Sequence, residues 1–205
     1  MAELQMIHGG PAARAEPAPL FPQMLREHTE LFQRLAALAP VVEHAARLVA
    51  ECLREGGKLM LCGNGGSAAD SQHIAAELTG RFQRERPAMA AIALTVDSSA
   101  LTCIGNDYGF EDIFARQVQG LGRRGDCLLA ISTSGRSPNV LRAVAAANAQ
   151  GICTIGLTGR DGAPLSQECR LAIRVPGEVT ARIQEAHIFI GHALCGLIDE
   201  NLWGC

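Results

Sequence analysis

The 205-residue sequence predicts an α/β protein with a three-layer, doubly wound, five-stranded parallel sheet and a helical pair at the N-terminus. Two observations carry this prediction. From residue 58 onward, short apolar runs alternate with segments of helical periodicity, which is the element order of such folds. The apolar runs also lack polar alternation, as expected for strands that helices cover on both faces.

The N-terminal part of the chain precedes the first predicted strand. Residues 1–19 include the stretch "HGGPAARAEPA" and are expected to form a flexible extension ahead of a single domain over residues 20–205. Helical spacing predicts one helix over residues 20–39 and a second from Pro40, which suits a first turn, to the Gly56-Gly57 pair. This helical pair exceeds what an α/β core needs, and we expect it to pack against another subunit.

The remaining chain supplies the sheet and its covering helices. The predicted strands are Lys58–Cys62, Ala90–Thr95, Asp126–Ser132, Cys153–Thr158 and Leu171–Val175, and the predicted helices cover residues 67–80, 111–120, 138–149 and 179–202. Ligands of such sheets bind beyond the carboxyl ends of the strands. The loops that follow the first four strands are therefore the places to look for a site.

Composition and charge exclude several classes of protein. Apolar residues make up 48% of the chain and charged residues 19%, as in ordinary globular proteins, and the net charge of −3 with no basic tract argues against nucleic-acid binding. No secretory signal or membrane-length apolar run is recognisable, which predicts no membrane association. The eight cysteines form no Cys-x-x-Cys pair, so we expect reduced thiols in a cytoplasmic protein.

Two loops rich in small residues follow predicted strands and enter predicted helices. The first is "GNGGS" at residues 63–67, and the second is "STSGRSP" at residues 132–138, where Ser137 is placed to cap the helix and Pro138 to begin it. Free backbone N–H groups and hydroxyls at a helix N-terminus suit a phosphate ester. The alternative is that both are merely tight turns. Neither loop has a nucleotide P-loop ending or the dinucleotide fingerprint, so NAD is not expected.

Polar side chains interrupt two of the helices. His73 and Glu77, at i and i+4, share one helix face, as do paired metal ligands, an acid and a base, or an ordinary surface hydrogen bond. Gln184 and His192 on the closing helix are separated by about 80° and can lean towards one cavity. A hydrogen-bonded core histidine is the alternative for His192 and our prediction for His187.

Five segments together resemble one known family. They are "CGNGGSAADSQHIAAELTGRF", "IGNDYGFEDIF", "LLAISTSGRSPNVLRAV", "LTGRDG" and "RIQEAHIFIGHALCGLIDENLW", and the resemblance as a whole runs from about Leu20 to Trp203. In order and spacing they are similar to the sugar isomerase (SIS) domain family, and within it to the phosphoheptose isomerases. The resemblance implies conversion of sedoheptulose 7-phosphate to D-glycero-D-manno-heptose 7-phosphate for the heptose of lipopolysaccharide. It also implies a homotetramer with sites shared between subunits and one divalent metal ion, usually Zn²⁺, in each subunit.

The family's functional residues map onto matching positions of this chain. The resemblance implies metal ligands at His73, Glu77, Gln184 and His192. It implies substrate contacts from Asn64, Gly65, Gly66, Ser67, Glu77, Asn106, Asp107, Ser132, Thr133, Ser134, Ser137 and Gln184. Glu77 becomes the expected catalytic base and His192 its acid/base partner, although a carboxylate bound tightly to zinc is a weaker base. Arg136 stands where the family commonly has Asn.

Two other functions compete with the enzyme. A non-enzymatic SIS relative that binds the bacterial replication initiator shares much of this sequence but lacks the counterparts of Glu77 and His192. A sugar-phosphate-sensing regulator would require a fused DNA-binding domain, for which residues 1–57 are too short. Because this chain has both Glu77 and His192, the isomerase is the favoured prediction.

Overall fold

The computed structural model describes residues 19–204, so residues 1–18 of the expected flexible extension and Cys205 lie outside the described part of the chain. Five strands form one sheet: β1 (Leu59–Gly63), β2 (Ala91–Ala93), β3 (Cys127–Ser132), β4 (Cys153–Gly159) and β5 (Leu171–Val175). All neighbouring pairs are parallel, in the order β2-β1-β3-β4-β5. The predicted sheet is confirmed, with β2 shorter than its apolar run.

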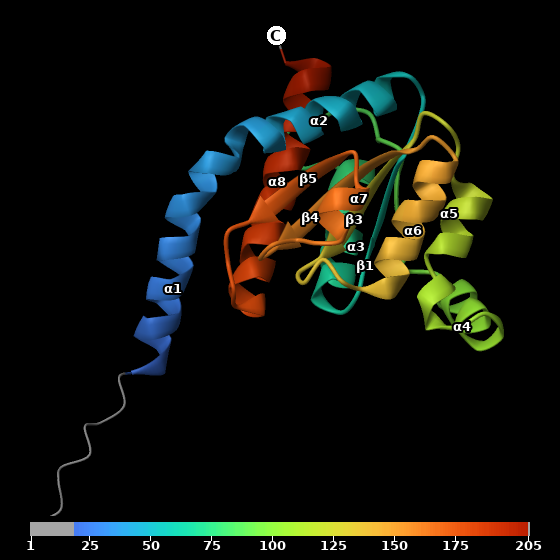
Figure 1. The fold of residues 1–205 in the computed structure, drawn as a ribbon. Coiled ribbons are helices and arrows are strands. Elements are labelled where there is room, and N and C mark those ends of the chain that lie inside the picture. Colours follow the sequence, from blue (N-terminus) through green and yellow to red (C-terminus); the bar gives the residue numbers. More distant parts are fainter. Residues whose placement is uncertain (1–18, 205) are drawn as a thin grey trace, which may run out of the picture.

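Helices cover both faces of the sheet (Figure 1). They are α1 (Leu20–Arg34), η1 (Leu35–Leu38), α2 (Ala39–Arg54), α3 (Gly66–Thr79), α4 (Ser98–Asp107), η2 (Phe110–Asp112), α5 (Ala115–Leu121), α6 (Pro138–Ala149), α7 (Leu165–Glu168) and α8 (Thr180–Trp203). One apolar core joins α2, α3 and α8 to one face of the sheet. The other core joins α5, α6 and the start of α7 to the opposite face, which completes the three layers.

The two N-terminal helices have different environments. Six residues of α2 are buried, and this helix packs on α8 and on the sheet of its own chain. In contrast, α1 buries only Leu31 and extends away from the body of the molecule (Figure 1). The apolar face of α2 completes the chain's own core, and the expectation that the helical pair packs against another subunit stays a prediction.

The sequence did not predict two of the helices, α4 and α7, and one predicted helix is divided in the structure. The α4 helix begins at an Asp97 cap, where the side chain accepts a hydrogen bond from the backbone N–H of Ala100 at 2.9 Å. The predicted helix over residues 111–120 is divided into η2 and the shorter α5. The four-residue α7 is too short to show helical periodicity.

The chain reverses its direction of strand addition between β1 and β3. These strands are hydrogen-bonded neighbours, yet the helices that follow them, α3 and α6, lie in different cores on opposite faces. This arrangement opens a crevice at the carboxyl ends of the two strands, where open α/β sheets bind ligands. No helix among residues 19–204 is long and apolar enough to cross a membrane.

Candidate active site

The first small-residue loop joins β1 to α3 and requires glycine at two positions. Gly65 has a φ of 55°, in the region that disfavours side chains. At Gly66 a β-carbon would lie 2.4 Å from the side-chain nitrogen of Gln184, so the missing side chain lets α8 approach this turn. The amide of Gln184 therefore occupies the side of the α3 N-terminus that faces α8.

The two small-residue loops are tied together. The side-chain amide of Asn64 donates to Oδ1 of Asn139 at 2.9 Å, and the amide of Asn139 donates back to Oδ1 of Asn64 at 2.8 Å. Asn139 is 2% exposed and lies in the first turn of α6. Since Gly63 and Ile131 are register partners in the sheet, the paired amides extend that register into the loops. The N-termini of α3 and α6 therefore flank a single crevice.

Two hydroxyls of the second loop, those of Ser132 and Ser137, lie together, and the Ser134 hydroxyl accepts the backbone N–H of Arg136 at 3.2 Å. Ser137 occupies the N-cap position of α6 and Pro138 follows it, as predicted, but the Ser137 side chain makes no capping hydrogen bond. Its Oγ lies instead 3.0 Å from Oγ of Ser132. Ser132 is buried, whereas Thr133 and Ser134 are half-buried. Ser67 in the first loop is also buried, and its backbone N–H donates to the carbonyl of Asn64 at 3.0 Å.

His73, Glu77 and His192 meet at one point between α3 and α8. The Nε2 atoms of the two histidines are 2.9 Å apart, and Oε1 of Glu77 is 3.2 Å from Nε2 of His73. The ring of His192 lies edge-on to His73 and stacks on Phe82. His192 is half-buried and lies close to Glu77 of the same chain. It is therefore not a histidine buried among apolar side chains.

The donor set of these three residues fits a metal ion. Two imidazole nitrogens and one carboxylate oxygen all lie within 4.8 Å of one another. A tetrahedral Zn²⁺ with bonds of about 2.0–2.1 Å requires ligand atoms roughly 3.3 Å apart, close to the observed separations. The close approach of two ring nitrogens also requires a shared proton or cation between them.

Gln184 is placed apart from these three side chains. Its amide packs against Gly66 at the start of α3, and it precedes His192 by eight residues, about 12 Å along the helix axis. Because α3 and α8 run in the same direction, Gln184 lies opposite Gly66 while His192 lies opposite His73. Gln184 therefore borders the end of the crevice next to the small-residue loop.

Asn106 and Asp107 lie elsewhere in the chain. They form the last turn of α4, where both are exposed and the Asn106 amide donates to Asp107 at 2.8 Å. This helix packs on η2, which packs on α6, on the side of the molecule away from α1 (Figure 1). Arg136 is bound to Asp161 at 3.1 Å and to the carbonyl of Ala163, which directs its charge away from the serine hydroxyls.

Asp70 and His187 have buried side-chain atoms without hydrogen-bond partners in the described chain, which the sequence did not predict. Asp70, one turn before His73, has an oxygen that is buried without a partner in the described chain, and burial raises its pKa to about 6, with His73 opposing the shift. The position of Asp70, three residues before His73 on the same helix, was the sequence signal that could have identified it. His187 is buried as predicted, but neither ring nitrogen has a hydrogen-bond partner within residues 19–204.

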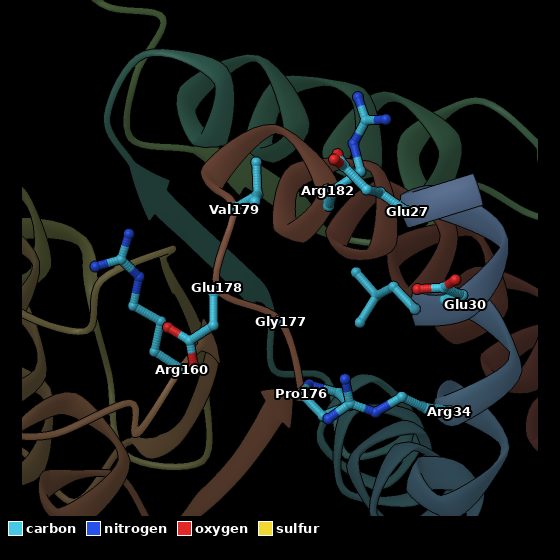
Figure 2. A pocket seen from close by; sticks show the side chains of 10 residues that line it. Glu27, Glu30, Arg34, Arg160, Pro176, Gly177, Glu178, Val179 and Arg182 are labelled. Atoms are coloured by element: carbon cyan, nitrogen blue, oxygen red, sulfur yellow. The ribbon is translucent and has the colours of Figure 1, made fainter. Parts of the chain in front are cut away.

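A cavity of about 490 Å³ opens beside the crevice, between α1 and the loop before α8 (Figure 2). Glu27, Glu30 and Arg34 line it from α1, and Arg160, Glu178 and Arg182 line it from the other side. His73, Glu77 and His192 do not line this cavity. The side chain of His73 is 48% exposed. In an isolated chain the candidate site is consequently open to solvent.

The fold and the site match a known class of protein. A family model described as "SIS domain" matches residues 23–159, so the class is that of SIS domain proteins. A phosphoheptose isomerase of Nitratiruptor sp. is 57% identical over 178 residues, covering 86% of this chain and 95% of the relative. This chain therefore belongs to the phosphoheptose isomerase family.

Solved structures lead to the same family. The phosphoheptose isomerase of Neisseria gonorrhoeae superposes with a TM-score of 0.78 at 49% identity, covering 88% of this chain and 95% of that one. The one from Francisella tularensis has a TM-score of 0.85 at 41% identity, covering 88% and 96%. The predicted family and fold are confirmed.

Proposed function

We propose that this protein is an aldose–ketose isomerase that converts sedoheptulose 7-phosphate to D-glycero-D-manno-heptose 7-phosphate. The observation that carries the proposal is the meeting of Glu77 with His73 and His192 beside a crevice formed by two small-residue loops. The 57% identity to a phosphoheptose isomerase supports this substrate. The heptose then serves lipopolysaccharide or a related surface glycan, and the charged substrate places the enzyme in the cytoplasm.

The reaction moves one carbon-bound proton and one hydroxyl proton. A base removes a proton from C1 of the ketose to give an enediolate, and the proton is returned at C2, while the proton on O1 passes to O2. We assign the carbon proton to Glu77 and the oxygen protons to His192. Both side chains occupy one face of the α3–α8 pair, which lets them reach adjacent carbons of one substrate.

The phosphoryl group belongs at the paired loops. Backbone N–H groups at the N-termini of α3 and α6, with the hydroxyls of residues 132–134 and 137, offer donors to phosphate oxygens without a buried cation. Gly66 and His73 are seven residues apart, about 10 Å along α3. That span is comparable with an extended seven-carbon sugar phosphate, so the sugar would lie along α3 with C1 at Glu77.

The metal ion is assigned to the same side chains. His73, Glu77 and His192 would hold Zn²⁺, whereas Gln184, the expected fourth ligand, packs against Gly66 about two turns away and would contact the substrate there. When bound, the ion supplies positive charge that polarises the substrate carbonyl. Glu77 cannot act as a full-strength base while it is a tight ligand, so turnover requires its carboxylate to exchange between the two roles.

The complete site is proposed to form in a homotetramer. The open position of the cluster and the exposed apolar side chains of α1, namely Leu20, Phe21, Met24 and Leu25, support contact with further subunits. Asn106 and Asp107, remote from the cluster in their own chain, are assigned to a neighbouring subunit's site. The non-enzymatic alternative, a protein that binds the replication initiator, is not supported, because the matched relatives are isomerases.

The proposal is tested by incubating the purified full chain with sedoheptulose 7-phosphate and following the product by NMR, with and without added Zn²⁺. We expect the aldose phosphate to appear and fructose 6-phosphate, as the control substrate, to react far more slowly. A protein that leaves sedoheptulose 7-phosphate unchanged with Zn²⁺ present contradicts the proposal. Equal turnover of the two sugars would contradict the seven-carbon assignment.

A further inference from the structure

Three cysteine side chains gather at the amino-terminal edge of the sheet, opposite the candidate active site. Cys127 begins β3 and Cys153 begins β4, and these two residues are register partners. Cys52 lies above them on α2, with its thiol donating to the carbonyl of Lys58 at 3.5 Å. The same carbonyl accepts the backbone N–H of Cys127 at 3.0 Å, so Cys127 lies between the other two.

A cavity gives small molecules access to this cluster. Its volume is about 490 Å³, and the three cysteines contribute to its lining. Cys127 is only 1% exposed, while Cys153 is half-buried and reaches the cavity surface. The charged groups around it are Glu51, Glu55, Asp126 and Arg170. Asp126 forms a salt bridge with Lys58 and accepts a hydrogen bond from the backbone N–H of Arg123.

The groups around Cys153 and Cys127 favour the thiolate form of Cys153 and the thiol form of Cys127. The Cys127 thiol donates to the carbonyl of Leu48 at 3.8 Å. Its proximity to Cys153, with help from Arg170, lowers the pKa of Cys153 to about 7, against the opposing effects of burial and Glu51. The same contact, together with Cys52 and burial, raises the pKa of Cys127. A thiolate at neutral pH is the reactive form of cysteine.

We propose that Cys153 is a modification site that reacts with hydroperoxides and that Cys127 converts the product to a disulfide. In the first step the Cys153 thiolate attacks one oxygen of hydrogen peroxide. The S–O bond forms, the O–O bond breaks, and hydroxide leaves and takes up a proton as water. The sulfur loses two electrons, and the peroxide gains them.

The second step uses the buried neighbour. Cys127 gives up its proton and attacks Sγ of Cys153, the S–S bond forms, and the S–O bond breaks with release of water. Register partners on adjacent strands have Cα atoms about 4.8 Å apart, within the range of roughly 4.4–6.8 Å found in disulfides. Cys52 is less suited as the second partner of Cys153, since Cys127 separates them.

Mass spectrometry of peroxide-treated protein tests the proposal. The full chain is oxidised, its free thiols are blocked with N-ethylmaleimide, and the peptides are analysed for disulfides. We expect a Cys127–Cys153 link in wild type and in the control Cys103→Ser, which removes an exposed thiol on α4. Cys127→Ser should leave a Cys153 sulfenic acid that dimedone traps, and Cys153→Ser should show neither product.

Alkylation of the unaltered protein gives a second readout that needs no variant to fold. Cys153 should react with iodoacetamide with a half-maximal rate near pH 7, about tenfold faster than Cys103 at that pH. A Cys153 that reacts no faster than Cys103 overturns the proposal. A Cys52–Cys127 disulfide with Cys153 unmodified overturns it as well.

Discussion

Single residues decide how closely α3 and α8 approach. The amide of Gln184 occupies the place where a β-carbon of residue 66 would stand, and about two turns further His73 contacts His192 at 2.9 Å. A β-carbon at position 66 would displace the amide of Gln184 from this turn. The glycine is therefore part of the candidate site although it carries no functional group.

His187 makes a residue-scale prediction about pH. Burial lowers its pKa from 6.5 to about 4, with the backbone of Thr158 partly opposing the shift. Between these values the unfolded chain binds a proton that the folded chain does not, so stability present above pH 6.5 is lost as the pH falls. The loss due to His187 is about 2 kcal/mol at pH 5. Asp70, whose pKa is raised to about 6, acts in the opposite direction.

The effect is measured as the difference between two proteins in urea unfolding at pH 7 and pH 5. His187→Leu should lose less stability than wild type over this interval, because it removes the titrating ring. The exposed His44→Gln is the control and should behave as wild type. Equal pH dependence of wild type and His187→Leu would show that the buried ring does not stay neutral.

At the scale of elements, the paired amides of Asn64 and Asn139 hold the two loops at one crevice. Asn139→Ala removes both hydrogen bonds and should destabilise the fold by about 1–3 kcal/mol. Because the phosphate donors then lose their common position, we expect a several-fold rise in KM for sedoheptulose 7-phosphate and a smaller change in kcat. Steady-state kinetics and urea unfolding measure the two effects.

The same helix offers a matched control. Asn148, at the far end of α6, also makes two side-chain hydrogen bonds, to Thr154 and to the carbonyl of Glu168. Because Asn148 is exposed, Asn148→Ala should lower stability by less than Asn139→Ala and leave KM unchanged. A KM that rises equally in both variants would indicate a general loss of structure rather than a role for the loops.

Elements also show where sequence reasoning succeeded and where it stopped. Helix spacing predicted that His73 and Glu77 share a face, and apolar runs predicted all five strands. Neither signal reports which helices pack together, so the meeting of His73 with His192 required the α3–α8 contact. For the same reason, spacing within α8 did not predict that Gln184 packs against Gly66. The α4 helix was missed although Asp97 is a residue type that often caps helices.

At the scale of the whole molecule, the sheet separates two regions of different chemistry. The carboxyl ends of β1 and β3 carry the crevice, with the α3–α8 cluster beside it, and the amino-terminal ends of β3 and β4 carry the cysteine cluster. The exposed α1 helix extends away from the body of the molecule on one side (Figure 1). We propose that the site is completed in an oligomer, because the cluster in one chain consists of His73, Glu77 and His192 without Asn106 and Asp107.

The most direct measurement is the kcat of sedoheptulose 7-phosphate isomerisation for Glu77→Gln and His192→Gln, with the exposed Glu43→Gln as control. Removing a positioned general base or acid should lower kcat by about 10²–10⁴-fold in each site variant. The control should keep wild-type turnover, and circular dichroism should show all three folded. Folded Glu77→Gln and His192→Gln proteins with wild-type kcat would contradict the assignment of catalysis to the α3–α8 cluster.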